Sequence, residues 1–120
     1  MKVIVYHINQ EDKELLALAN RKKHKITIIV YPLNNLTVHF AASKDTVIII
    51  DQEEPLSSDL IQKLVFLGIK NIIFRSQENL PPDLSVIKDS GLKYIALTMT
   101  DSKLASSRMI EILDVWEKSD

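Results

Sequence analysis

Short runs of β-branched, almost uninterrupted apolar residues alternate along this chain with longer segments in which apolar positions recur every three or four residues. The apolar runs lie at residues 2–8, 25–31, 46–50, 70–74 and 93–97. Runs of this length and composition favour strands that are covered on both faces. The sequence therefore predicts five buried strands, each separated from the next by a segment that returns across the sheet.

The segments between the strands carry helix signals. Helices are predicted over 9–24, 55–68, 82–91 and 100–118, and a weaker one over 34–44. Asn9 and either Ser57 or Ser58 are suited to cap helix starts, and Gly68 and Gly91 to end helices. Arg21, Lys22 and Lys23 are expected in the last turn of the first helix, and His24 beside them, where the helix dipole favours positive charge.

Each predicted helix has an apolar face that we expect to point inward. The expected inward residues are Leu15, Leu18 and Ala19; Leu36, Phe40 and Ala41; Leu60, Leu64 and Leu67; and Ala105, Met109, Ile112 and Trp116.

Strands alternating with helices imply parallel pairing through right-handed crossovers. Five such strands predict an α/β fold: a three-layer, doubly wound, flavodoxin-like parallel sheet in the order 2-1-3-4-5, with residues 1–120 as one domain. In sheets of this kind, ligands bind beyond the carboxyl ends of the strands.

Composition narrows the possible functions. The net charge of -1 argues against a nucleic-acid partner, and the chain has no cysteine for a thiolate or zinc–thiolate site. No apolar run is long enough to suggest a signal peptide or a membrane span. We therefore expect a cytoplasmic protein.

Polar residues follow several of the predicted strands and form the candidate site. His7 ends the first strand and Asp51 the third, while Arg75 and Ser76 follow the fourth. An Arg at a strand end can hold a carboxylate or phosphate with two hydrogen bonds, or else form a surface salt bridge. A rim His can act as a base, bind a ligand, or simply pack.

The acidic loop at residues 51–54 leaves two interpretations open. It can hold a hard cation, or it can be a solvated acidic loop, and the second is favoured because no partner ligands are evident. Asp51 and Ser76 also resemble, loosely, the phosphorylated Asp and the Ser or Thr of a receiver domain. The acidic pair and the Lys of such domains have no counterpart here, so two of the four receiver features are present. Because no partner ligands are evident at the acidic loop, we expect no metal.

The chain contains no phosphate-binding loop, because its two glycines, Gly68 and Gly91, both end helices. The first helix also begins with two acids, Glu11 and Asp12, which oppose a phosphate at that point.

The opening "MKVIVYHINQEDKELLALA", the segment "LSSDLIQKLVFLGIKNIIFRSQENLPPDLSVIKDSGLKYIALT" and the last helix together resemble one protein family. This is the N-terminal substrate-binding (catalytic) domain of the D-isomer-specific 2-hydroxyacid dehydrogenases, and within it the chain is most similar to the D-lactate dehydrogenases. The resemblance covers the whole chain and implies the flavodoxin-like fold.

The chain departs from this family where the resemblance implies chemistry. The family's Arg-Ser loop carries a glycine whose neighbouring amides help hold the substrate carboxylate, and here Glu78 takes that position, followed by Pro81 and Pro82. A carboxylate at Glu78 repels an anionic 2-oxo acid. The family's catalytic Arg, Glu and His, and its NAD-binding domain, have no counterpart. We expect no catalytic residue and no cofactor here, with NAD available only through a separate domain.

Three functions follow as hypotheses. The first is a stand-alone, non-catalytic domain that binds a small ligand or a protein, with His7, Asp51, Arg75, Ser76 and Glu78 as ligand-binding candidates. The second is the substrate half of a split dehydrogenase, whose NAD-binding partner covers apolar surface at Ile112, Leu113 and Trp116. The third is a homodimer formed through Ile110 and Val115.

Overall fold

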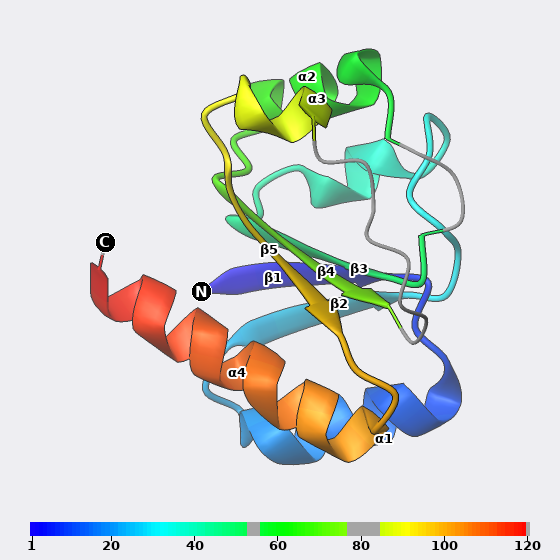
Figure 1. Cartoon of the computed structure of the whole chain (residues 1–120), viewed down its shortest axis with the longest axis vertical. Helices are drawn as coiled ribbons and strands as arrows, with labels where there is room; N and C mark the ends of the chain where they lie inside the picture. Colours follow the sequence, from blue (N-terminus) through cyan, green and yellow to red (C-terminus); the bar gives the residue numbers. More distant parts are fainter. Residues whose placement is uncertain (53–55, 77–84, 120) are drawn as a thin grey trace.

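Five strands form a single parallel sheet in the computed structural model, which describes residues 1–52, 56–76 and 85–119 (Figure 1). They are β1 (Lys2–Tyr6), β2 (Lys25–Ile29), β3 (Thr46–Ile50), β4 (Asn71–Ser76) and β5 (Lys93–Thr98). Their order is β2-β1-β3-β4-β5. The predicted doubly wound topology is therefore confirmed. All carboxyl ends of the strands meet at one edge, which we call the carboxyl rim.

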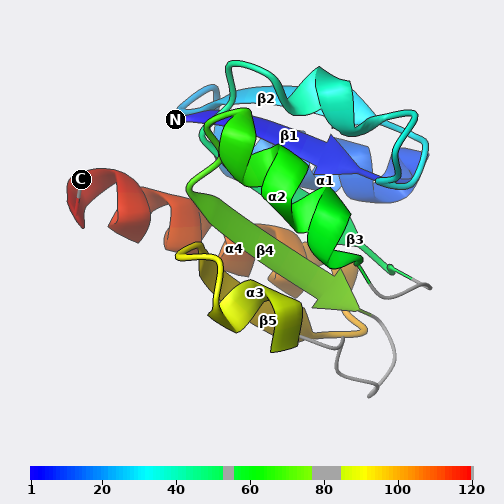
Figure 2. The ribbon, with the colours of Figure 1, turned by 90° about the horizontal axis from the view of Figure 1, so that it is seen from above.

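Helices cover both faces of the sheet. On one face lie α1 (Gln10–Asn20) and α4 (Ser102–Ser119), and on the other lie α2 (Ser58–Phe66), the short α3 (Ser85–Lys88) and a 3-10 turn, η1 (Val38–Ala41) (Figures 1 and 2). Alternate residues of the central strands enter the two cores. Ile48, Ile50 and Ile73 pack under α1 and α4, while Ile49 and Ile72 pack under α2. Three layers result, as the sequence predicts.

The helix boundaries follow the signals in the sequence at most points. The side chain of Asn9 accepts a hydrogen bond from the Asp12 amide at 2.8 Å, and Ser57 accepts one from the Leu60 amide at 3.1 Å. Gly68 has a φ of +97°, so the chain after α2 turns through a conformation that a side chain disfavours. These capping and stop predictions are confirmed.

The inward face of α1 differs from the prediction. Leu16 is the apolar residue that α1 buries fully, and Asp12 and Asn20 are buried on the same face. Leu15 and Ala19 are only partly buried, and Leu18 is 72% exposed. The helix is rotated relative to its most apolar stripe because Asp12 and Asn20 find partners inside the protein, as described below.

The end of α1 also differs from the prediction. Asn20 is its last residue, and Arg21 and Lys22 follow in left-handed conformations with φ of 48° and 62°. The basic residues 21–23 therefore lie after the helix and not in its last turn.

The predicted helix over 34–44 is reduced to η1. The side-chain oxygen of Asn34 accepts hydrogen bonds from the amides of Leu36 and Thr37, and the Thr37 hydroxyl donates to the Pro32 carbonyl at 2.8 Å. Such local bonds compete with helix formation. Of the three residues expected to face inward, Ala41 is buried, while Leu36 and Phe40 are exposed.

The last helix buries its predicted stripe of Ala105, Met109, Ile112 and Trp116. Ile110 and Leu113 are buried with them, so the surface expected at Ile112, Leu113 and Trp116 for a partner is used inside the chain. The predicted interface residue Ile110 is likewise part of the core, and only Val115 of that pair is exposed. No helix among the described residues is both long and apolar enough to cross a membrane.

Candidate functional site

The carboxyl rim brings His7 and Asp51 to the ends of the adjacent strands β1 and β3. Both residues adopt positive φ angles, 65° for His7 and 47° for Asp51. Non-glycine residues in this region store strain, and such residues gather at functional sites. The backbone holds both in place: the His7 amide reaches the carbonyls of Ile29 and Tyr31 at 2.9 and 3.0 Å, and the Asp51 amide donates to the Arg75 carbonyl at 2.8 Å.

The ring of His7 is oriented by the neighbouring strand. Its Nδ1 lies 2.9 Å from the carbonyl oxygen of Ile50. A carbonyl only accepts, so Nδ1 carries the hydrogen of this bond, and the neutral ring keeps its lone pair on Nε2. No hydrogen bond to Nε2 is present within the described part of the chain. His7 therefore presents a fixed hydrogen-bond acceptor at the half-buried end of β1.

Arg75 takes a different position from the other rim residues. It is 2% exposed and lies beneath α1 and α4, where its Nη1 donates to Asp12 at 3.1 Å and its Nη2 to the Ser102 hydroxyl at 3.4 Å. Its Nε has no hydrogen-bond partner within residues 1–52, 56–76 and 85–119. Arg75 does form a salt bridge, but the prediction that this bridge lies on the surface is wrong, because both side chains are buried.

Asp12 is the ion-pair partner of Arg75, and the sequence analysis did not predict this role. Its carboxylate lies beside the guanidinium at the start of α1, and the side chains of both are almost fully buried. The one available signal was the spacing of Asp12, Leu16 and Asn20, which places two polar residues on the same helical face as a buried leucine.

The remaining rim candidates are placed only in part. Ser76 is half-buried at the end of β4, and its carbonyl accepts from the Met99 amide at 2.9 Å. Glu78 lies outside the described residues, as do Glu53 and Glu54 of the acidic loop. Among the residues that the structure describes, no three His, Asp or Glu side chains are grouped as a metal site would require.

A second polar cluster lies at the opposite edge of the sheet, around His24. This histidine is buried, with Nε2 2.8 Å from Asp114 of α4, and its backbone is held by both atoms of the Asn20 side-chain amide. The hydrogen bond from His24, with help from Lys23, holds the pKa of the Asp114 carboxyl below its usual value. The amino group of Met1 likewise lowers the pKa of Glu117. His24 therefore joins α1 to α4, which the helix-dipole expectation for it did not foresee.

Comparison with known proteins identifies the relatives of this fold. No protein-family model and no curated protein sequence matches the chain. Among solved structures it is similar to the apo-structure of D-lactate dehydrogenase from Escherichia coli, with a TM-score of 0.71 and 26% identity over 81% of this chain and 31% of that one. It is also similar to D-2-hydroxyisocaproate dehydrogenase, with a TM-score of 0.70 and 19% identity over 82% and 30% of the two chains.

A third similar structure is D-lactate dehydrogenase with NAD+ from Lactobacillus jensenii, with a TM-score of 0.70 and 20% identity over 100% of this chain and 40% of that one. The predicted similarity to the D-lactate and D-2-hydroxyacid dehydrogenases is thus confirmed. The chain spans about a third of the length of the enzymes that it matches.

Proposed function

We propose that this chain is a ligand-binding domain of the D-2-hydroxyacid dehydrogenase type that does not transfer hydride by itself. Its ligand is a small molecule that donates hydrogen bonds and binds at the carboxyl rim. The observation that carries the proposal is that His7 and Asp51, which directly follow the adjacent strands β1 and β3 at the carboxyl rim, both have a positive φ. Strain of this kind persists only where the surrounding structure holds it, and it is frequent in ligand sites.

The charges of the rim support the choice of ligand. His7 Nε2 is a hydrogen-bond acceptor at the rim, whereas the guanidinium of Arg75 is buried against Asp12. A hydroxyl or ammonium group therefore finds an acceptor at His7. An anionic 2-oxo acid finds the guanidinium of Arg75 already paired with Asp12. In the sequence, Glu78 follows β4 by two residues and carries a further negative charge.

The residues of this chain do not fit a dinucleotide. Gly68 and Gly91 both end helices with positive φ, so neither is placed in a phosphate-binding loop. The helices that start at the rim carry Glu11, Asp59 and Asp101 at or next to their first turns, and these acids oppose the negative charge of a phosphate. A substrate half that works with a separate NAD-binding domain is the second candidate, supported by the similarity to about a third of each enzyme.

Two experiments test the proposal. Native mass spectrometry of the freshly purified chain should show a retained small mass that is lost in His7→Leu and kept in His39→Leu, a control at an exposed histidine of η1. In ¹H–¹⁵N spectra, ethanolamine or glycerol should shift the amides of His7 and Asp51 more than pyruvate does. Rim shifts that are stronger with pyruvate would overturn the choice of ligand.

The absence of catalysis is tested separately. We expect no oxidation of NADH with pyruvate by the purified chain, because hydride transfer needs the cofactor held beside the substrate. Turnover that grows in proportion to the concentration of the chain, and that is lost in Asp51→Asn, would refute the non-catalytic assignment. Turnover that appears only after a separate NAD-binding domain is added would favour the second candidate.

A further inference from the structure

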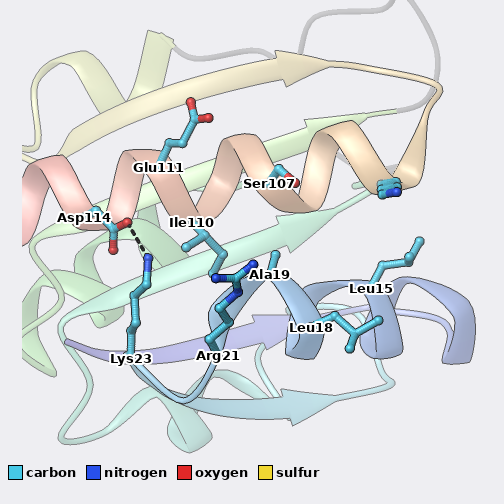
Figure 3. A pocket seen from close by; sticks show the side chains of 10 residues that line it. Leu15, Leu18, Ala19, Arg21, Lys23, Ser107, Ile110, Glu111 and Asp114 are labelled. Atoms are coloured by element: carbon cyan, nitrogen blue, oxygen red, sulfur yellow. Dashed lines mark hydrogen bonds and ion pairs between the residues drawn. The ribbon is translucent and has the colours of Figure 1, made fainter.

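A groove of about 380 Å³ runs along the outer surface between α1 and α4, on the helical face and not across the strand ends (Figure 3). Leu15, Leu18 and Ala19 of α1 line one side, and Ser107 and Ile110 of α4 line the other. Leu18 is 72% exposed here, although it belongs to the most apolar stripe of its helix. Exposed apolar surface on paired helices is typical of a contact with another protein.

The two helices run in the same direction and in register. Asp12 of α1 and Ser102 of α4 both contact Arg75 at the rim, and His24 contacts Asp114 at the opposite edge. His24 and Asp114 are 90 residues apart in the chain, as are Asp12 and Ser102. A residue of α1 is therefore level with the residue of α4 that is 90 positions later, along the whole groove.

At each end of the groove, the outward-facing charge on α1 is opposite in sign to the one on α4. Near the rim, α1 carries Glu14 and α4 carries Lys103. At the far end, Arg21 follows α1 while α4 carries Glu111. Within the described residues, neither Arg21 nor Lys103 takes part in an ion pair, and Glu111 is paired only with Arg108 on its own exposed surface.

We propose that this face binds a second copy of the chain across a two-fold axis parallel to the groove. Such an axis keeps each level of the groove opposite the same level and places α1 of one copy over α4 of the other. Glu14 then faces Lys103 of the second copy, and Arg21 faces Glu111. Leu18 lies between these two charged levels, so an apolar centre is flanked by complementary charges, as in isologous interfaces.

This interface is independent of the proposed rim ligand, because the groove lies on the outer helical face. It also replaces the predicted dimer contact at Ile110, because Ile110 is buried and Leu18 is the exposed apolar residue of the groove.

The first test is the dimer dissociation constant from analytical ultracentrifugation. The wild-type chain should be a dimer at micromolar concentration, and Leu18→Glu should weaken it by at least about 100-fold, because each dimer loses two central apolar contacts. Phe66→Glu is the matched control, since Phe66 is 90% exposed on α2, across the sheet. A wild-type chain that is monomeric at about 1 mM, or a dimer that Leu18→Glu leaves unchanged, overturns the proposal.

The second test fixes the axis. Glu14→Lys and Lys103→Glu should each weaken the dimer about 2- to 30-fold, since two exposed ion pairs are lost. An equimolar mixture of the two variants should regain wild-type affinity. Only the mixed dimer restores both ion pairs, one between the native Glu14 and Lys103 and one with the two charges exchanged. Ion pairs within one chain cannot be restored by mixing. A mixture no tighter than the weaker variant therefore contradicts the proposed arrangement.

Discussion

Replacing Asp12 by alanine should strongly destabilise this protein, because the change strands a buried positive charge. The side chains of Arg75 and Asp12 are 1% and 5% exposed, and their contact is 3.1 Å long. Without Asp12, the guanidinium retains the Ser102 hydroxyl at 3.4 Å as its hydrogen-bond partner among the described side chains. Breaking one side of a buried pair costs about 3–5 kcal/mol.

For a domain of this size, that loss corresponds to a decrease in melting temperature of roughly 10–20 °C. Urea unfolding followed by circular dichroism gives the free energy of unfolding directly, provided that the slope with denaturant is unchanged. Asp59→Ala is the matched control. Asp59 also lies in a first helical turn, but its pair with Lys63 is exposed, and its loss should cost about 0.5 kcal/mol or less.

The double variant Asp12→Leu/Arg75→Met completes the experiment. Replacing a whole buried pair by apolar side chains is often neutral or stabilising, so the double variant should be more stable than Asp12→Ala by about 3 kcal/mol. The reasoning fails if Asp12→Ala costs less than about 1 kcal/mol, or if the double variant is no more stable than the single one. A small cost for Asp12→Ala would show that solvent reaches the guanidinium.

Three further predictions concern single features of the fold. Asn9→Ala should lower the free energy of unfolding by about 1 kcal/mol in urea, because α1 loses its cap. Gly68→Ala should cost about 1–2 kcal/mol by the same measurement, through backbone strain alone, because no atom beyond Gly68 and its two chain neighbours lies within 4 Å of the added methyl group. The pKa of Asp114 is lowered by His24 and Lys23, so its contribution to stability is present above its ordinary value of 3.8 and is lost as the pH falls through the lower, folded-state value. Melting temperatures of the wild type and of Asp114→Asn should therefore differ at pH 6 and converge at strongly acidic pH.

The strands and their order could be predicted because strands buried on both faces have continuous apolar sequences. A strand can be recognised at Val47, Ile48 and Ile49 without knowing which distant residues they contact. The face of α1 could not be read in the same way. Its buried residues include Asp12 and Asn20, and a polar residue is buried only where a partner lies in the folded chain.

The candidate site shows the same division. The positions of His7 and Asp51 follow from strand ends and sheet order, so their placement at the same rim is a consequence of topology. The role of Arg75 depends on Asp12, which is 63 residues away, and no local pattern connects the two. Which side chain a rim arginine contacts is decided by the packing of α1 against α4.

The contact between Met1 and Glu117 has a consequence for the connectivity of the chain. The residue before the first strand therefore lies next to the end of the last helix. A short linker from Ser119 to Met1 can join the two ends into a closed ring while leaving both cores intact, and new ends can then be opened in an exposed turn such as Ala42–Ser43. The native arrangement of sheet and helices thus depends on which surfaces meet.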